Sequence, residues 1–283
     1  MILPGNASCH GCPISLAFRA VEEIENPVLV IPAGCSTVIA GMHPNHALKC
    51  PVVHVPFAST TAVACGLSEA YRRRGIPGNV VAWMGDGAAD IGFSTLSASA
   101  ARNDDIMVVV VDNEAYMNTG TQSSLSTPRW AKTTTTPGGK EVPRRDLGLL
   151  MLMHRIPYAA TASVGYMRDL RRKFRRASQL DGFRFVHVHA PCPPGWRFDS
   201  SLTVDVARMA VESLAWVLWE FDGKLKISEI SERSYASRGS IAEYLKIQGR
   251  FAELSEDEIR TIERDVEEHW LTLKSLQRRF NSE

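Results

Sequence analysis

Two oxygen-bearing side chains, Asp86 and Asn113, are spaced so that they could share a metal ion. Asp86 lies in a Gly-Asp-Gly turn directly after a short apolar run, and Asn113 follows a second apolar run 27 positions later. The glycines allow a tight turn and the close approach of a bulky anion, and the N-terminus of a following helix offers free N–H groups to phosphate. Mg²⁺ is usually held by one or two protein groups together with phosphate oxygens. The pattern predicts a site for a diphosphate group and its metal ion.

This interpretation depends on where the two apolar runs end. If both are parallel strands joined by a helix, their ends reach the same edge of the sheet, which is where open α/β sheets bind ligands. A lone Gly-Asp-Gly also occurs in many turns, so the alternative is a βα turn without a ligand. The second oxygen, at the end of the next strand, favours the metal site.

Four of the six cysteines form a second candidate site. They are Cys9, Cys12, Cys35 and Cys192. Four thiolates can hold a 4Fe-4S cluster or a structural zinc ion, and the Cys-x-x-Cys pair could be a thioredoxin-like redox motif, although no evident strand precedes it. The spacing alone leaves these alternatives open. Cys50 and Cys65 have no matching partners, so we expect small buried hydrophobic residues there.

The elements that must position these residues alternate along the chain. Short apolar runs, typical of buried parallel strands, are Val28–Ile31, Val52–Val55, Val80–Trp83, Ile106–Val111 and Phe185–His189. Helical spacing is found in Ala58–Tyr71, Phe93–Arg102 and Met167–Leu180. Strands that alternate with helices predict an α/β fold with a doubly wound, mostly parallel sheet.

One long segment interrupts this alternation. Residues 114–146 are rich in Thr, Ser, Pro and Gly. A loop of that length in a compact domain is usually functional or disordered.

The chain changes character again after Trp196. Leu202–Phe221 has the pattern of an apolar amphipathic helix, and Lys224–Ile227 that of a short strand. A final helix is predicted to start at Ser255, with Glu258 in position for a capping box. We therefore expect an α/β domain over residues 1–199 and a helical extension over residues 200–283, packed on that domain or on a partner chain.

The composition excludes several classes of protein. The chain has 283 residues with 45% hydrophobic and 22% charged residues, which is ordinary for a globular protein. A formal net charge of +1 gives no reason to expect binding to nucleic acid or to an anionic membrane. No apolar run approaches the roughly 18–20 residues that span a bilayer, and the start lacks the pattern of a signal peptide. We expect a cytoplasmic protein.

The longer motifs resemble a known family. Gly85-Asp-Gly followed by Asn113 is similar to the diphosphate-binding signature of thiamine-diphosphate enzymes. The strings Asp112-Asn-Glu-Ala-Tyr-Met-Asn-Thr-Gly, Gln122-Ser-Ser and Ser126-Thr-Pro look like the β subunit of pyruvate:ferredoxin oxidoreductase and its 2-oxoacid relatives. The resemblance spans nearly the whole chain, including the tail from Ile241 to Phe251.

The resemblance implies specific roles. Asp86, the Asn113 side chain and the Ala115 carbonyl would hold Mg²⁺, and Asn118 would lie beside the reacting part of thiamine diphosphate. Further residues implied in cofactor binding are Gly34, Cys35, Ser36, Phe57, Gly85, Gly87, Ala88 and Thr119. Phe57 could equally be a core residue. The cysteines of the second candidate site match the family's cluster-binding cysteines, which favours 4Fe-4S over zinc.

One departure from the family pattern concerns the first cysteine motif. Some relatives have Gly-Glu after the Cys-x-Gly-Cys, and that Glu contacts the cofactor. Pro13-Ile14 stands here instead, which puts a cofactor contact from this position in doubt.

The resemblance also implies a reaction and partners. The expected reaction is the oxidative decarboxylation of a 2-oxoacid, pyruvate by family default, with electrons passed through the cluster to ferredoxin and the acyl group to coenzyme A. Relatives act on 2-oxoisovalerate, 2-oxoglutarate, aryl glyoxylates or oxalate. The Glu that activates thiamine would come from a separate α subunit with a pyrimidine-binding domain, and γ and δ-type ferredoxin-like subunits would complete the enzyme.

The alternatives are a non-redox thiamine decarboxylase or carboligase subunit with structural zinc, and an electron-transfer module with a degenerate thiamine site.

Overall fold

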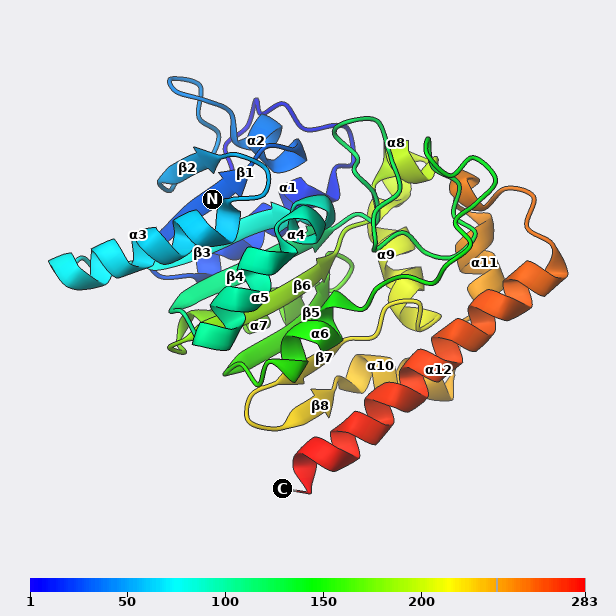
Figure 1. Cartoon of the computed structure of the whole chain (residues 1–283). Coiled ribbons are helices and arrows are strands. Elements are labelled where there is room, and N and C mark those ends of the chain that lie inside the picture. Colours follow the sequence, from blue (N-terminus) through cyan, green and yellow to red (C-terminus); the bar gives the residue numbers. More distant parts are fainter. Residues whose placement is uncertain (238, 283) are drawn as a thin grey trace.

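The computed structural model describes residues 1–237 and 239–282. Within these residues eight strands form one sheet in the order β2-β1-β3-β4-β6-β5-β7-β8 (Figure 1). The strands are β1 Pro27–Pro32, β2 Val52–Val55, β3 Asn79–Gly85, β4 Ile106–Asp112, β5 Tyr158–Ser163, β6 Phe183–His189, β7 Trp219–Phe221 and β8 Leu225–Ile227. The five strands predicted from apolar runs correspond to β1, β2, β3, β4 and β6 and are confirmed.

The sheet is mostly parallel. The strands from β2 to β5 pair in parallel, whereas β7 is antiparallel to β5 and β8 to β7. β5 was not predicted, because its Tyr-Ala-Ala-Thr-Ala-Ser sequence is rich in small residues with little strand preference. It forms a strand because all six of its residues are buried between β6 and β7.

Helices cover both faces of the sheet, as a doubly wound fold requires. Alternate strand residues point to opposite faces, and the strand cores divide accordingly between two hydrophobic clusters. One face is covered by α3 Thr60–Arg74, α4 Asp86–Ile91, α5 Phe93–Arg102 and α6 Leu147–Met153. The other face is covered by α1 Pro13–Phe18, the 3₁₀ helix η1 Arg19–Glu23, α2 Cys35–Ala40 and α7 Met167–Ser178. The predicted helices correspond to α3, α5 and α7.

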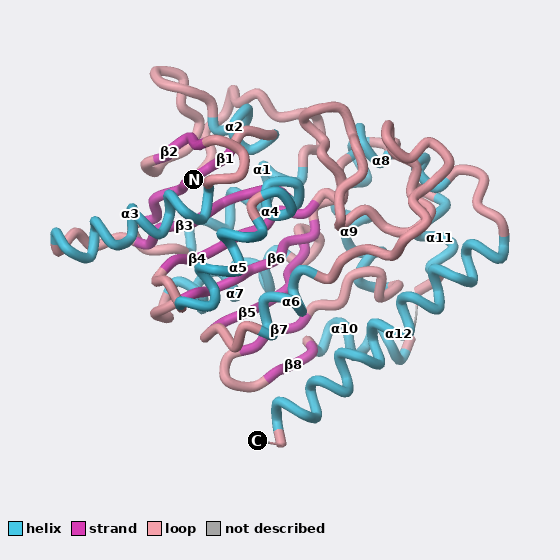
Figure 2. Tube along the Cα trace, in the orientation of Figure 1, coloured by secondary structure: helices cyan, strands magenta, loops and turns pink. Residues whose placement is uncertain are grey.

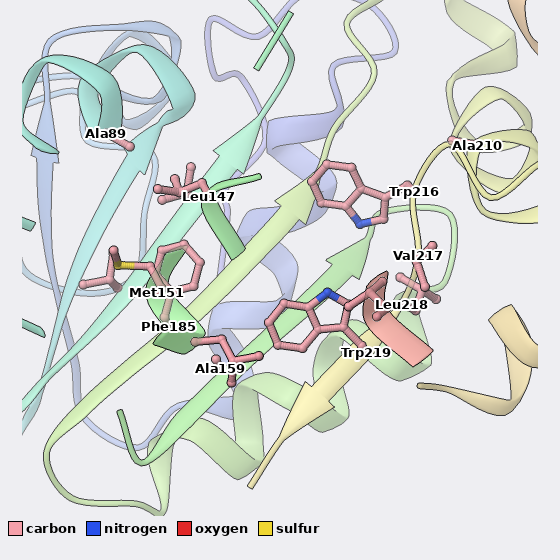
Figure 3. Packing of buried hydrophobic residues seen from close by; sticks show 14 of the residues in the cluster. Ala89, Leu147, Met151, Ala159, Phe185, Ala210, Trp216, Val217, Leu218 and Trp219 are labelled. Carbon is pink, nitrogen blue, oxygen red and sulfur yellow. The ribbon is translucent and has the colours of Figure 1, made fainter. Parts of the chain in front are cut away.

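The larger cluster joins the sheet to the C-terminal part of the chain. Figure 3 shows Phe185 of β6 and Met151 of α6 on one side of this cluster, with Trp216 and Trp219 on the other. Trp219 is almost fully buried and Trp216 is 4% exposed. The C-terminal segment therefore completes the core of the α/β domain.

The prediction of a single helix over Leu202–Phe221 is wrong. The helix α9, Thr203–Glu212, ends early, and the backbone adopts a left-handed conformation at Leu214 (φ 63°). The chain then runs into β7, which pairs with β5. The apolar run from Leu214 to Trp219 was misleading because most of its residues are buried in the larger hydrophobic cluster, so their hydrophobicity does not reflect a helical period.

The remaining elements are helices. They are α8 Pro193–Trp196, η2 Ser200–Leu202, α10 Glu229–Ala236, α11 Ile241–Lys246, η3 Gly249–Phe251 and α12 Glu256–Asn281. The predicted capping box at the start of α12 is confirmed: Ser255 accepts from the Glu258 N–H and the Glu258 side chain accepts from the Ser255 N–H. Figure 1 shows α12, in orange and red, along one side of the molecule beside α10 and α11.

The long loop predicted after β4 is present. Between Asp112 and Leu147 the described chain forms no helix or regular strand. This segment and the other loops that follow the carboxyl ends of the parallel strands gather on one side of the molecule (Figure 2). No helix in the described part of the chain is long and apolar enough to cross a membrane.

Candidate active site

The two predicted metal ligands follow neighbouring strands. β3 and β4 pair in register with Gly85 opposite Val111, so Asp86 and Asn113 leave the sheet at the same edge. Both are buried, with 2% and 6% of their surface exposed. Asp86 Oδ2 and Asn113 Oδ1 find no hydrogen-bond partner among the described residues. Buried oxygens are rarely left unsatisfied, so this pair fits a bound divalent cation.

A cavity of about 410 Å³ opens above these strand ends. All twelve residues expected to bind thiamine diphosphate line it, namely Gly34, Cys35, Ser36, Phe57, Gly85, Asp86, Gly87, Ala88, Asn113, Ala115, Asn118 and Thr119. Seven lining residues were not predicted as cofactor ligands: Ile14, Pro32, Ala33, Ile91, Val111, Tyr116 and Met117. Tyr116 and Met117 stand inside the quoted motif, so their place in it was the available signal.

Gly87 is required by the packing of this cavity. A Cβ atom at Gly87 would overlap the ring of Tyr116 and approach Phe57 to 3.3 Å. The Tyr116 and Phe57 rings meet edge to face with centroids 6.4 Å apart. Phe57 therefore lines the cavity and also packs on another aromatic residue.

Ile14 lies in the wall of this cavity. It belongs to α1, which begins directly after Cys12, and is 4% exposed. At this position the chain presents an aliphatic surface to the cavity.

The electrostatics of Asp86 and Asp112 are set by burial and by neighbouring ionisable groups. Burial raises the pKa of Asp86 well above its usual range, and the nearby charge of Asp112 raises it further. Burial also acts to raise the pKa of Asp112, but the hydrogen bond from His187 Nε2 at 2.8 Å, the electrostatic effect of that ring and the positive charge of Arg144 bring it below its usual value. A cation beside Asp86 would favour its ionised form.

The four predicted cluster cysteines come from three separate segments. Cys9 and Cys12 precede α1, Cys35 begins α2 and Cys192 caps α8. Each of the four acts electrostatically on another: the charges of Cys192, Cys12 and Cys9 raise the pKa of Cys35, after burial, to about 12. Burial also raises the pKa of Cys192 to about 11, with Cys12 and Cys9 adding to the rise and Arg250 opposing it. The fold thus brings the four thiols into one region.

No group of three or more Cys, His, Asp or Glu side chains that could hold a metal ion is found within residues 1–237 and 239–282. Four thiolates can hold either a 4Fe-4S cluster or a structural zinc ion, and metal analysis of the protein distinguishes the two.

The first cysteine loop is fixed to the C-terminal segment through Gly11. Its backbone is left-handed (φ 67°), and a Cβ atom there would overlap the carbonyl oxygen of Ser200. Thr203 Oγ1 donates a hydrogen bond of 2.7 Å to the Gly11 carbonyl. Glycine is thus the residue that allows the loop between Cys9 and Cys12 to close against this segment.

Cys50 and Cys65 lie apart from this region. Both are half-buried, and neither lines the cavity. Cys65 contacts Ser99 and Asp104 instead.

Comparison with known proteins agrees with this geometry. Residues 32–188 match the family described as "Thiamine pyrophosphate enzyme, C-terminal TPP binding domain". That range contains the cavity-lining strand ends, so fold and site together define a thiamine pyrophosphate enzyme.

Similar proteins narrow the class of thiamine pyrophosphate enzyme. The chain is 42% identical to ketoisovalerate oxidoreductase subunit VorB of Pyrococcus abyssi, over 96% of this chain and 92% of that one. It is 40% identical to pyruvate synthase subunit PorB of Methanothermobacter marburgensis, over 94% of each. The chain belongs to the family of β subunits of 2-oxoacid:ferredoxin oxidoreductases, which are oxidoreductase enzymes. A solved 2-oxoglutarate:ferredoxin oxidoreductase from Magnetococcus marinus shares the fold, with a TM-score of 0.59 and 22% identity over 72% of this chain and 77% of that one.

Proposed function

We propose that this chain is the thiamine-diphosphate- and 4Fe-4S-binding subunit of a coenzyme-A-dependent 2-oxoacid:ferredoxin oxidoreductase. The observation that carries the proposal is the pair of unsatisfied buried oxygens on Asp86 and Asn113 inside a cavity lined by all twelve expected residues. The four clustered thiols beside that cavity would hold the 4Fe-4S cluster that accepts the electrons. Cys35 belongs to both sites, because it also lines the cavity.

The residues have separate roles in this proposal. Asp86, Asn113 and the Ala115 carbonyl hold Mg²⁺, and the turn from Gly85 to Ala88 at the start of α4 faces the diphosphate. Phe57 and Ile14 shield the inner wall from water, and Asn118 lies at the exposed mouth of the cavity, where a 2-oxoacid would enter. When bound, thiamine diphosphate supplies the electron sink for decarboxylation and the cluster accepts electrons one at a time.

A group needed to activate thiamine is expected from another subunit. Among the described residues that line the cavity, Asp86 is the only acidic one, and it is committed to the metal. The activating Glu is therefore assigned to an α subunit with a pyrimidine-binding domain, and ferredoxin-like γ and δ-type subunits complete the electron path. The relatives named above are themselves designated subunits.

The proposed function assigns a role to each part of the chain. We assign the cofactors to residues 1–199 and a supporting role to residues 200–283, which extend the sheet by β7 and β8. All six cysteines are free thiols, which suits a reducing compartment such as the cytoplasm.

The first test is the cofactor content and activity of the enzyme purified anaerobically with its partner subunits. We expect thiamine diphosphate, magnesium, iron and sulfide in the preparation, and reduction of ferredoxin that depends on a 2-oxoacid and on coenzyme A. Zinc in place of iron and sulfide, or 2-oxoacid turnover without electron transfer, would support the non-redox decarboxylase. The isolated chain is expected to be inactive, and clear turnover by it alone would contradict the assignment of the Glu to a partner.

The substrate is the second question. Pyruvate is the family default, and 2-oxoisovalerate has equal support from the relatives, which are 40% and 42% identical to this chain. The aliphatic side chain of Ile14 in the cavity wall is compatible with a branched acid. A panel of 2-oxoacids on the assembled enzyme, read as kcat/KM, separates the two.

A further inference from the structure

The turn Asp112–Glu114, named the metal turn because Asn113 is a proposed Mg²⁺ ligand, is held in an unfavourable backbone conformation by a buried ion-pair network. Glu114, which follows Asn113, has a left-handed backbone (φ 61°) and is 2% exposed. Its carboxylate lies between two arginines: Arg144 Nη1 donates to Oε1 at 3.0 Å, and Arg250 Nη2 donates to Oε2 at 2.6 Å. A left-handed backbone is costly for a residue with a side chain, so these bonds help to keep the turn in place.

The second arginine, Arg250, belongs to the tail from Ile241 to Phe251, which resembles the family. Arg250 lies in η3, after α11, and only 3% of its side chain is exposed. Its guanidinium group stacks over Trp196, 3.5 Å from the ring centroid, and its Nε donates to Gln248 Oε1 at 2.9 Å. The tail thus places the guanidinium group of Arg250, oriented by Trp196 and Gln248, at the carboxylate of Glu114.

Trp196 connects Arg250 to the backbone of the metal turn. Its indole N–H donates a hydrogen bond of 2.8 Å to the backbone carbonyl of Asn113. Arg250 and Trp196 therefore hold two successive residues of the metal turn, Arg250 through the side chain of Glu114 and Trp196 through the backbone of Asn113.

The same tryptophan belongs to the segment that carries the fourth cysteine. The backbone N–H of Trp196 donates to the Cys192 carbonyl at 2.9 Å, closing the short helix α8. A Cβ atom at Gly195 would overlap the sulfur of Met117, so this segment also lies directly against the cavity wall. Arg250 further acts on Cys192 through its charge.

We propose that Arg250 and Trp196 are positioning residues that fix the Asp112–Glu114 metal turn against the Cys192–Trp196 segment, and so set the placement of the two cofactors relative to each other. The proposal rests on the proposed function. It gives the tail from Ile241 to Phe251 a role, since this tail brings Arg250 to a carboxylate 136 positions earlier in the chain.

The sharpest test is the pair of variants Trp196→Phe and Trp216→Phe in the assembled enzyme. Trp196→Phe keeps an aromatic face for Arg250 and removes only the N–H that binds Asn113. Trp216→Phe is the matched control, because the Trp216 indole N–H has no hydrogen-bond partner among the described residues. The measurement is calorimetric titration of the cofactor-stripped enzyme with thiamine diphosphate at a series of Mg²⁺ concentrations.

We expect Trp196→Phe to raise the Mg²⁺ concentration needed for half-maximal thiamine diphosphate binding by about three- to tenfold, the worth of one hydrogen bond. Trp216→Phe should leave that concentration within about twofold of the wild-type value. An unchanged Mg²⁺ requirement in Trp196→Phe overturns the positioning role. If the wild-type enzyme itself shows no Mg²⁺-dependent binding, the proposed function fails, which is a distinct result.

A second pair of variants tests Arg250. Arg250→Gln removes the charge, and Arg250→Lys keeps the charge but loses the planar fork. We expect Arg250→Gln to raise the Mg²⁺ requirement at least about tenfold and to change the electron paramagnetic resonance spectrum of the reduced cluster, with Lys giving partial rescue of both. Arg129→Gln is the control, since Arg129 pairs with Asp265 of α12 instead.

A merely structural role predicts a different outcome. Arg250→Gln would then lower the melting temperature but leave both the Mg²⁺ requirement and the cluster spectrum of the folded enzyme unchanged, and that result would overturn the proposal. If Arg250→Gln fails to assemble, the comparison of Trp196→Phe with Trp216→Phe decides the matter.

Discussion

Asp86 and Asn113 face the same cavity from the ends of adjacent strands, and each has a buried oxygen that accepts no hydrogen bond within residues 1–237 and 239–282. A protein interior seldom leaves two neighbouring acceptors unsatisfied, since each costs roughly 1–3 kcal/mol. The arrangement therefore lowers the stability of the metal-free chain. In the proposed function, the same two oxygens are available to bind a cation.

The substitution Asp86→Asn tests this trade directly. It keeps the shape of the side chain and removes the charge, so we expect Mg²⁺-dependent binding of thiamine diphosphate to weaken at least about a hundredfold, or about 3 kcal/mol. The metal-free variant should be more stable than the wild type, because a buried carboxylate without a counter-ion no longer has to be accommodated. Calorimetry and urea unfolding in a chelator measure the two effects, with exposed Asp205→Asn as the control.

The same pair of proteins gives a prediction about pH. Burial raises the pKa of Asp86 in the folded chain, so the folded state keeps a proton that the unfolded state releases. The contribution of Asp86 to the stability of the metal-free wild type must then fall as pH rises above the ordinary carboxylate value. The Asp86→Asn chain lacks this dependence, and its advantage in free energy of unfolding should grow between about pH 5 and about pH 7. An advantage that shrinks over this interval would contradict the raised pKa.

The sequence predicted those parts of the fold in which pattern and environment agree. β1, β3 and β4 are continuous apolar runs because both of their faces are covered by helices. The prediction failed for β5 and for Leu202–Phe221, where burial is imposed by distant segments: small residues form a central strand, and an apolar run turns at Leu214. No local period reports such tertiary constraints.

The candidate site was more accessible to sequence reasoning than the network that supports it. Gly85–Ala88 and Asp112–Thr119 are contiguous motifs whose positions follow directly from strand ends. Arg250 was unrecognised because its partner Glu114 is 136 positions away and nothing in a single sequence marks the pair. Resemblance of the tail to the family was the one signal that pointed there.

The cysteines give a prediction with internal controls. Replacing Cys9, Cys12, Cys35 or Cys192 singly with Ser should lower iron and sulfide content and remove the visible absorption of the cluster, because each thiolate binds a separate iron. Cys50→Ser and Cys65→Ser should leave both unchanged, since these residues lie outside the cavity lining. Metal analysis and absorption spectra of anaerobic preparations decide the outcome. Loss of zinc in place of iron from the first set would favour the structural-zinc alternative.

Two glycines offer a contrast in packing. A Cβ atom at Gly87 would overlap the Tyr116 ring, whereas at Gly66 in α3 it would meet no heavy atom of the described chain within 4 Å. We expect Gly87→Ala to destabilise the protein by about 1–3 kcal/mol and to weaken cofactor binding. Gly66→Ala should stabilise it by about 0.5–1 kcal/mol, because alanine favours a helix. Urea unfolding measures both, and equal effects of the two substitutions would argue against the Tyr116 contact.

The long loop gives the last prediction, because one buried carboxylate contacts it at three points. Asp90, in α4, pairs with Arg145 near the end of the loop, accepts from the Leu125 N–H at 2.9 Å, and lies 3.4 Å from the Tyr116 hydroxyl. Asp90→Ala removes all three contacts and leaves Arg145 without its ion pair.

We expect limited proteolysis of the metal-free Asp90→Ala chain to cleave between residues 114 and 146 at least about tenfold faster than in the wild type, since rapid local opening controls such cleavage. Asp104→Ala, which breaks a pair with the exposed Arg102 on the far end of α5, is the control and should leave the cleavage rate unchanged. Because Tyr116 lines the cavity, the same Asp90 variant should bind thiamine diphosphate more weakly. Faster cleavage with unaltered binding would show that the loop is fastened independently of the cavity.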